Sequence, residues 1–189
     1  MKTLGWVAAG FVVSVAGCGG KSATVSSVDL PKLEVDLPTL EAGRVPDESV
    51  YGGGSGCTGA DHSLGVRWRG APAAAQSFAV ILHDPDAPRS GGWYHWAVFD
   101  LPPSTNELPK GASSSGLPAG AKQGKNDFGD VRYGGPCPPP GAPHHYVAHV
   151  FALDVATLGL AEGADAKDVE SAAKKHALAA GEATGTYGR

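Results

Sequence analysis

The chain has 189 residues, with 15 Lys and Arg residues against 19 Asp and Glu residues, and its formal net charge is −4. Such a chain lacks the basic surface typical of nucleic-acid binding, so we exclude that class of function. Hydrophobic residues make up 42%, enough for a folded core, and 28 Gly and 15 Pro residues favour turns and short strands over long helices. One domain is expected once any targeting segment is removed.

Residues 1–17 have the pattern of a secretory signal peptide. Lys2 supplies a positive charge, an apolar run follows, and small residues precede Cys18. The run is shorter than the ~20 residues that a membrane-spanning helix needs. The sequence Val-Ala-Gly-Cys also resembles the lipobox of bacterial lipoproteins, which implies cleavage before Cys18 and lipidation of that cysteine. The alternative is an ordinary secreted protein with a spare cysteine.

Residues 18–39 are predicted to tether this anchor to the domain. They contain a short repeat whose copies start at Val28 and Val35, and a Pro in each copy rules out a continuous helix. Alternation of Val35 and Leu37 makes the second copy a candidate first strand. We expect residues 40–189 to form the domain, lipid-anchored in a bacterial cell envelope on its periplasmic or extracellular side.

Two cysteines remain after this segment, Cys57 and Cys137. In an oxidising compartment they can pair in only one way, and a loop of that length would contribute roughly 4 kcal/mol. The alternative is two reduced, partly buried thiols. A zinc site is not expected, because neither cysteine belongs to a CxxC pair.

Apolar and aromatic runs predict four strands. They cover Val66–Trp68, Phe78–Leu82, Trp93–Asp100 and His144–Leu153. The two-residue period places His95 on one face with Ala97 and Phe99, and it places His144 on one face with Tyr146. Between the last two strands, residues 105–129 form a long irregular excursion of the kind that usually has a function.

The end of the chain changes to a helical period. Asp165 is a candidate N-cap, and Gly181 is a natural stop. The residues between them that share one helical stripe are Val169, Ala172, Ala173, His176 and Ala180. The sequence therefore predicts a mostly β fold with peripheral helices, including one near the C-terminus.

Polar side chains with binding chemistry lie at or near strand ends, beside loops stiffened by Pro or Gly. They are Asp84, Asp86, His95, His144 and Tyr146. Protonated imidazoles, a phenol and glycine N–H groups make a donor-rich pocket, which suits a small anion such as phosphate. Asp84 is expected to face the ligand and Asp86 to hold the loop. Affinity should fall as pH rises through the ordinary His pKa of about 6.5.

Two catalytic alternatives use the same residue types. Asp and His side chains could bind a metal ion in a metallohydrolase, although no HExxH spacing is present. A hydrolase with a nucleophile, His and Asp would need a Ser or Cys in a sharp turn, and there is no GxSxG. Cys137, between prolines, is the only unusual candidate nucleophile.

Several motifs in this order resemble the phosphatidylethanolamine-binding protein family, in its bacterial Raf-kinase-inhibitor-like branch. They are Asp84-Pro85-Asp86-Ala87-Pro88, His95-Trp96, the Gly134–Pro139 segment and His144-His145-Tyr146, within a similarity that covers roughly residues 40–189. The resemblance implies a central antiparallel sheet packed on a smaller sheet, with peripheral helices. It also implies a pocket for phosphate-like groups lined by Asp84, His95, His144 and Tyr146, with Gly135 and Pro136 as a wall.

The family's roles are binding and inhibition of kinases or proteases, so the resemblance implies neither catalysis nor a cofactor. An inhibitor module that acts on an envelope protease or a kinase-like partner is therefore a second hypothesis, with residues 105–129 as a candidate contact. The chain departs from the family at His145, where Arg is usual. Any ion pair at that position becomes dependent on pH.

Overall fold

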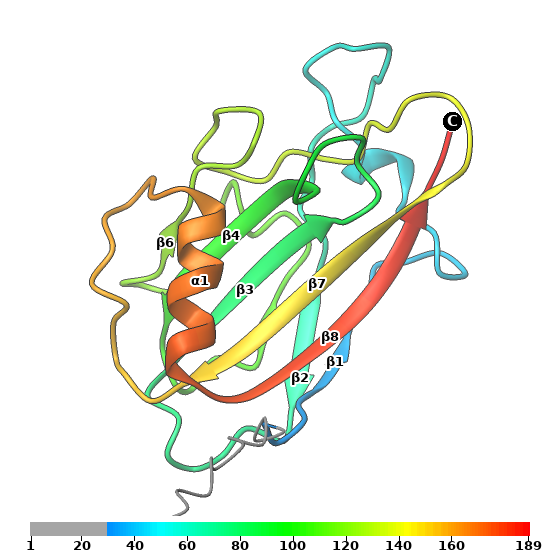
Figure 1. Ribbon diagram of the computed structural model, residues 1–189. Coiled ribbons are helices and arrows are strands. Elements are labelled where there is room, and N and C mark those ends of the chain that lie inside the picture. Colours follow the sequence, from blue (N-terminus) through cyan, green and yellow to red (C-terminus); the bar gives the residue numbers. More distant parts are fainter. Residues whose placement is uncertain (1–29) are drawn as a thin grey trace, which may run out of the picture.

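The computed structural model describes residues 30–189, so the predicted signal segment, Cys18 and residues 18–29 of the predicted tether lie outside the described residues. The described part has two antiparallel sheets and one α-helix (Figure 1). The larger sheet has the order β6 (Lys122–Gln123), β4 (Trp93–Leu101), β3 (Ser77–Asp84), β7 (His144–Leu153) and β8 (Ala177–Tyr187). The smaller sheet has the order β1 (Glu34–Asp36), β2 (Val66–Arg69) and β5 (Glu107–Leu108). The predicted fold class is confirmed.

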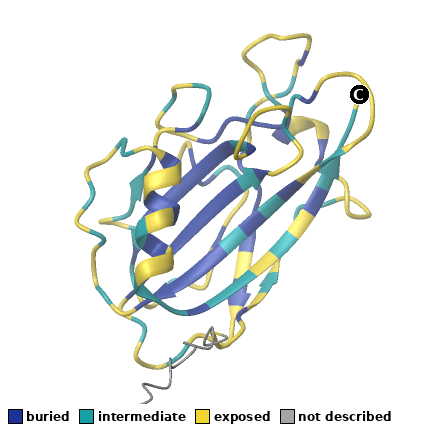
Figure 2. Ribbon diagram, in the orientation of Figure 1, coloured by how far each residue is buried: buried dark blue, intermediate teal, exposed yellow. Residues whose placement is uncertain are grey.

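The larger sheet is the middle layer, and both of its faces are covered. Val80 and Leu82 of β3 belong to a core shared with Trp68 of the smaller sheet. Ala79 and Ile81 belong to a second core beneath α1 (Ala166–His176). Since alternate side chains point to opposite faces, burial on both sides explains why the run in β3 is continuously apolar. Figure 2 shows β3 and β4 as the most thoroughly buried elements.

The C-terminal part differs from the prediction. The helix begins after Asp165 as expected, but it ends at His176, so the prediction that its stripe extends to Ala180 is wrong. Ala177–Tyr187 forms β8, which pairs with the whole length of β7. Gly181 does not stop a helix. It permits close approach of a neighbouring segment, because a Cβ there would lie 2.2 Å from the backbone oxygen of Leu33.

The part of the predicted tether that the structure describes is packed on the domain. Leu33 and Leu37 are buried in the core between the sheets, and β1 pairs with β2. The Leu33 N–H also donates to the Ala180 carbonyl at 2.8 Å. The second copy of the repeat is therefore the first strand, and the fold begins before residue 40 because these leucines have apolar surface to bury. Within residues 30–189, no helix is long and apolar enough to span a membrane.

One end of the larger sheet gathers the polar residues. Antiparallel pairing puts the end of β3 beside the start of β4 and beside the start of β7, with the end of β8 next to β7. Loops from distant parts of the sequence cover this end (Figure 1). The chain enters at the other end, where Lys32 bridges to Ala180 near the start of β8.

Candidate functional site

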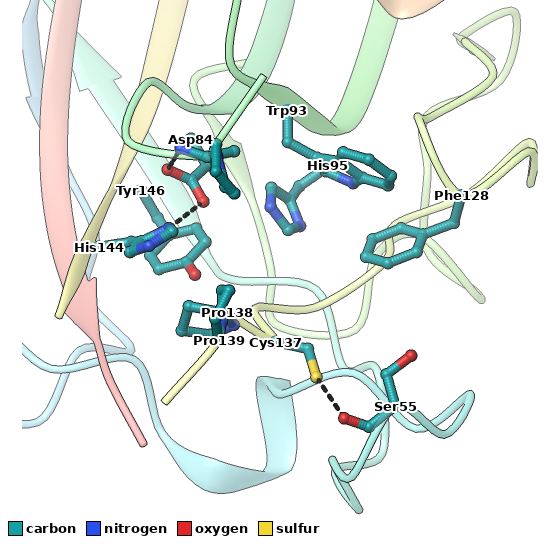
Figure 3. A pocket seen from close by; sticks show the side chains of 12 residues that line it. Ser55, Asp84, Trp93, His95, Phe128, Cys137, Pro138, Pro139, His144 and Tyr146 are labelled. Carbon is teal, nitrogen blue, oxygen red and sulfur yellow. Dashed lines mark hydrogen bonds and ion pairs between the residues drawn. The ribbon is translucent and has the colours of Figure 1, made fainter. Parts of the chain in front are cut away.

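A cavity of about 240 Å³ opens at this end of the larger sheet (Figure 3). Its lining combines polar strand ends with aromatic rings and prolines. The lining residues are Ser55, Asp84, Ala87, Pro88, Trp93, His95, Phe128, Cys137, Pro138, Pro139, His144 and Tyr146. The fold thus brings Asp84, His95, His144 and Tyr146 together, as the resemblance implied. No Lys or Arg is among these lining residues.

Asp84 is the last residue of β3, and the residue is 3% exposed. One oxygen accepts hydrogen bonds from the backbone N–H groups of Asp86 and Ala87, at 2.8 and 3.1 Å. The other lies 2.8 Å from Nδ1 of His144. Asp84 therefore shapes the loop and orients His144, besides lining the cavity.

Asp86 lies outside the cavity lining and is largely exposed. Its Oδ2 accepts from the backbone N–H of His145 at 2.8 Å and lies 2.7 Å from the Nδ1 of that ring. The backbone hydrogen bond and the imidazole lower the pKa of the Asp86 carboxyl. Asp86 thus ties the loop after β3 to the start of β7 through the backbone and the ring of His145.

A β-bulge aims His95 into the cavity. Leu82 pairs with Trp96 and His83 pairs with Tyr94, which leaves His95 as the extra residue in β4. The prediction that His95 shares a face with Ala97 and Phe99 is therefore wrong. Those two residues pack beneath α1, whereas the His95 ring lies edge-on to Tyr146 with centroids 5.2 Å apart.

The chemistry of His95 is that of a neutral imidazole. Its Nδ1 lies 2.7 Å from the Gly134 carbonyl oxygen, which can only accept, so Nδ1 carries the proton. Burial lowers the pKa of His95 to about 4. At neutral pH its Nε2 therefore holds a lone pair. His95 does not supply the pH dependence near 6.5 that the sequence predicted.

Four buried side-chain donors have no partner among the described residues, on Ser49, Trp68, Trp93 and Tyr146, and the two at the cavity are the Tyr146 hydroxyl and the Trp93 indole N–H. Burial, followed by the nearby Asp84 carboxylate, raises the pKa of Tyr146, so its hydroxyl stays protonated. In Figure 3 this hydroxyl points toward the space between His95 and the prolines. Unpartnered buried donors are uncommon and suggest a ligand or solvent with acceptor atoms.

The wall opposite the sheet is covalently fixed. Cys57 and Cys137 form a disulfide across 80 residues of sequence, which decides between the two states that the sequence left open. Cys137 therefore has no thiol to act as a nucleophile. Pro138 and Pro139 follow it along the wall.

Gly135 and Pro136, predicted as a wall, stand behind the cavity and not among the residues that line it. The Gly135 N–H donates to Asp61 Oδ1 at 2.8 Å, and the Pro136 carbonyl accepts from the Tyr51 N–H at 3.1 Å. A Cβ at position 135 would lie 2.2 Å from the backbone oxygen of Ser49. These residues hold the proline segment against the loop that carries Cys57.

Sequence reasoning missed Trp93, Phe128 and Ser55 as lining residues. Phe128 comes from the 105–129 excursion and stacks on Tyr51 with ring centroids 4.2 Å apart. The aromatic start of β4 was a signal for Trp93. Ser55 and Phe128 reach the cavity only through tertiary packing. Within residues 30–189, no group of three or more His, Cys, Asp or Glu side chains is placed to hold a metal ion.

A five-stranded antiparallel sheet packed on a three-stranded one, with a small cavity at one end, defines the PEBP-like class of fold. Residues 41–188 match the family model described as phosphatidylethanolamine-binding protein, and the chain belongs to that family. It falls in the bacterial branch of UPF0098 proteins typified by YbhB and YbcL.

Two E. coli relatives in this branch are 37% and 40% identical to the chain over the aligned residues. YbcL of Escherichia coli is 40% identical over 131 residues, covering 67% of this chain and 72% of YbcL. YbhB of the same organism is 37% identical over 146 residues, covering 76% of this chain and 92% of YbhB. The crystal structure of E. coli YbcL, described as a new member of the mammalian PEBP family, has a TM-score of 0.79 at 34% identity and covers 84% of this chain and 99% of that one. A putative PEBP homologue from Chlamydia trachomatis, CT736, has a TM-score of 0.69 at 31% identity and covers 84% and 98%.

Proposed function

We propose that this protein binds a small oxyanion, such as phosphate or a phosphate-like headgroup, in the cavity at the end of the larger sheet, and that it acts by binding without catalysis. The observation that carries the proposal is the buried, unpartnered hydroxyl of Tyr146 in the wall of that cavity. A ligand oxygen would satisfy this donor. Leaving it unsatisfied costs about 1–3 kcal/mol.

Three further features support an oxyanion. The Trp93 indole N–H is a second unpartnered donor in the lining. His144 is oriented through Nδ1 by the buried Asp84, so its Nε2 is left for the ligand, and it donates when the ring is protonated. The cavity of about 240 Å³ has room for an ion the size of phosphate.

The proposal extends to an exported protein with a lipid anchor at Cys18. Its support is the pattern of residues 1–17 together with the disulfide between Cys57 and Cys137. Disulfides persist in oxidising compartments such as the periplasm and are rare in the cytosol. Mass spectrometry of the protein isolated from its own membranes tests this extension. An unmodified chain that still carries residues 1–17 would contradict it.

Isothermal titration with inorganic phosphate tests the binding function directly. We expect saturable binding to the wild-type protein at one site, and at least tenfold weaker binding to Tyr146→Phe, because one donor to the ligand is lost. NMR should show the His95 and His144 imidazole signals shifting during the titration. Imidazole signals that stay unchanged at saturating phosphate would refute the proposal.

The inhibitor hypothesis stays a prediction. Phe128 of the 105–129 excursion contributes to the cavity wall, so the part of the excursion around it already has a role within the domain. An envelope protease or kinase-like partner would be recovered by a pull-down with the wild-type protein. Substitutions in the exposed part of the excursion should abolish that recovery if the hypothesis holds.

A further inference from the structure

His95 places a hydrogen-bond acceptor in the cavity, beside the unpartnered donors of Tyr146 and Trp93. Nδ1 is committed to the Gly134 carbonyl at 2.7 Å, and the second ring nitrogen, Nε2, has no hydrogen-bond partner among the described residues. In a neutral imidazole that carries its proton on Nδ1, Nε2 can only accept. A fully deprotonated ligand oxygen beside Nε2 would set two lone pairs against each other.

The residues around His95 keep its imidazole neutral. Its neighbours with titratable groups are Asp84, His83, Asp127, Tyr146 and His144. Asp84 and Asp127 favour the charged form of His95 and His83 opposes it, but burial outweighs them and the pKa is lowered to about 4. Tyr146 remains a neutral phenol for the reason given above.

The charges of the residues that line the cavity also disfavour a fully deprotonated ligand. The buried Asp84 carboxylate lies in the cavity wall, and no Lys or Arg is among the residues that line it. Asp84 is paired with Nδ1 of His144 at 2.8 Å. A ligand with two negative charges would therefore be poorly compensated in a buried site.

We propose, on the basis of the function proposed above, that this pocket selects oxyanions that retain a proton on one oxygen, and that His95 is the specificity-determining residue. The ligand's O–H donates to Nε2 of His95, while its other oxygens accept from Tyr146 and Trp93. Dihydrogen phosphate and the monoanion of a phosphomonoester have this pattern, with a single negative charge. Sulfate, sulfate monoesters and phosphodiesters do not, because they carry no ionisable proton in the neutral range.

Methyl phosphate and methyl sulfate provide a matched pair of probes. At about pH 5 the first is mainly a monoanion with one P–OH, since the second pKa of a phosphomonoester is about 6. Methyl sulfate has the same charge and nearly the same shape without the O–H. Titration calorimetry at this pH should show methyl phosphate binding roughly tenfold to a hundredfold more tightly, the range expected when a buried acceptor is left unpaired.

A second arm uses pH. Between about pH 5 and about pH 7.5, the monoanionic fraction of methyl phosphate falls roughly thirtyfold, and its affinity should fall in parallel. Methyl sulfate does not titrate, so any change in its affinity reports protonation of the protein. The ratio of the two affinities isolates the ligand proton.

The variant His95→Gln separates specificity from structure. Its amide can donate as well as accept, so the preference for methyl phosphate over methyl sulfate should shrink to less than about threefold. A purely structural role for His95 would weaken both ligands equally and leave their ratio unchanged. Should this variant fail to fold, the wild-type ligand pair still decides the matter.

The outcomes are distinct. Equal affinity of the wild-type protein for the two probes at about pH 5 would overturn the proton requirement and leave the oxyanion-binding function standing. No binding of either probe, nor of inorganic phosphate, would overturn both. Tighter binding of methyl phosphate that survives unchanged in His95→Gln would assign the selectivity to another residue and overturn the role of His95.

Discussion

At the scale of single residues, the site is defined by which hydrogen bonds are made and which are left open. Asp84 accepts from two backbone N–H groups and from His144, so it is fully engaged in holding the site. Tyr146 is as deeply buried but makes no hydrogen bond to the described residues. Residues whose polar groups are already hydrogen-bonded, such as Asp84, should govern stability. Residues with an unpartnered polar group, such as Tyr146, should govern ligand binding.

The variant Tyr146→Phe tests this distinction. Loss of an unpartnered hydroxyl should leave the free energy of unfolding unchanged or raise it by up to about 1 kcal/mol, while phosphate affinity falls. Chemical denaturation and titration calorimetry measure the two effects. The matched control is Tyr133→Phe, whose hydroxyl donates to the Ser49 carbonyl at 2.8 Å away from the lining. That control should lose about 1 kcal/mol of stability and keep its affinity.

His95 makes stability depend on pH. Its folded pKa of about 4 lies below the unfolded value of 6.5, so the unfolded chain binds the proton more readily. The stabilisation from neutral His95 is complete above about pH 6.5 and is lost as pH falls toward about 4, by on the order of 3 kcal/mol in total. Denaturation midpoints across this range should decline less steeply in His95→Gln than in the wild type. Parallel profiles would contradict the burial of a neutral ring.

At the scale of elements, the cavity depends on a bulge in β4 and on a disulfide between two loops. The bulge directs the His95 ring into the cavity. The disulfide joins the Cys57 loop, which contributes Ser55, to the segment that contributes Pro138 and Pro139. Because these segments have little regular secondary structure, the disulfide and the backbone hydrogen bonds of Gly134, Gly135 and Pro136 hold that wall in place.

Reduction of the disulfide should therefore weaken both folding and binding. The chain-entropy model gives a loss of about 4 kcal/mol for a loop of this length. Phosphate affinity should fall at the same time, because the wall loses its fixed position. Denaturation and calorimetry with and without a reductant measure this. In the double variant Cys57→Ser with Cys137→Ser, addition of the reductant should have no effect, and an effect there would show that the reductant acts elsewhere.

The pairing of β8 with the N-terminal segment predicts a sharp difference between two glycines. Gly181→Ala places a Cβ 2.2 Å from the backbone oxygen of Leu33, so the segment must shift and stability should fall by about 1–3 kcal/mol. Gly185→Ala instead meets the end of the Leu40 side chain at 2.8 Å, which can rotate away. Thermal denaturation should show the larger loss for Gly181→Ala. Equal losses would argue against the close backbone approach.

At the scale of the whole molecule, the sequence predicted the middle layer well and its edge poorly. Strands β3, β4 and β7 are buried on both faces for much of their length, so their apolar and aromatic runs are visible without tertiary information. β8 consists largely of Ala, Gly and Thr. Its strand conformation comes from pairing with β7 and not from its own propensity, so a helical stripe extended too far into it.

The residues of the site were also predicted only in part. Asp84, His95, His144 and Tyr146 could be identified because each stands at or near a strand end in a recognisable motif. The direction of His95 could not, since a bulge breaks the two-residue period on which the prediction depended. Ser55 and Phe128 lie on loops far away in the sequence, and only the packing of those loops brings them to the cavity.

The cavity and the point where the described chain enters the domain lie at opposite ends of β8. The chain reaches the domain beside Ala180, and the cavity opens near Tyr187, which pairs with His144. Seven residues of strand at about 3.3 Å each put roughly 23 Å between these points. With the proposed anchor at Cys18, tension on the chain would act at the pole opposite the pocket and turn the opening toward the aqueous phase. The protein would then draw its ligand from solution and not from the lipids that hold it.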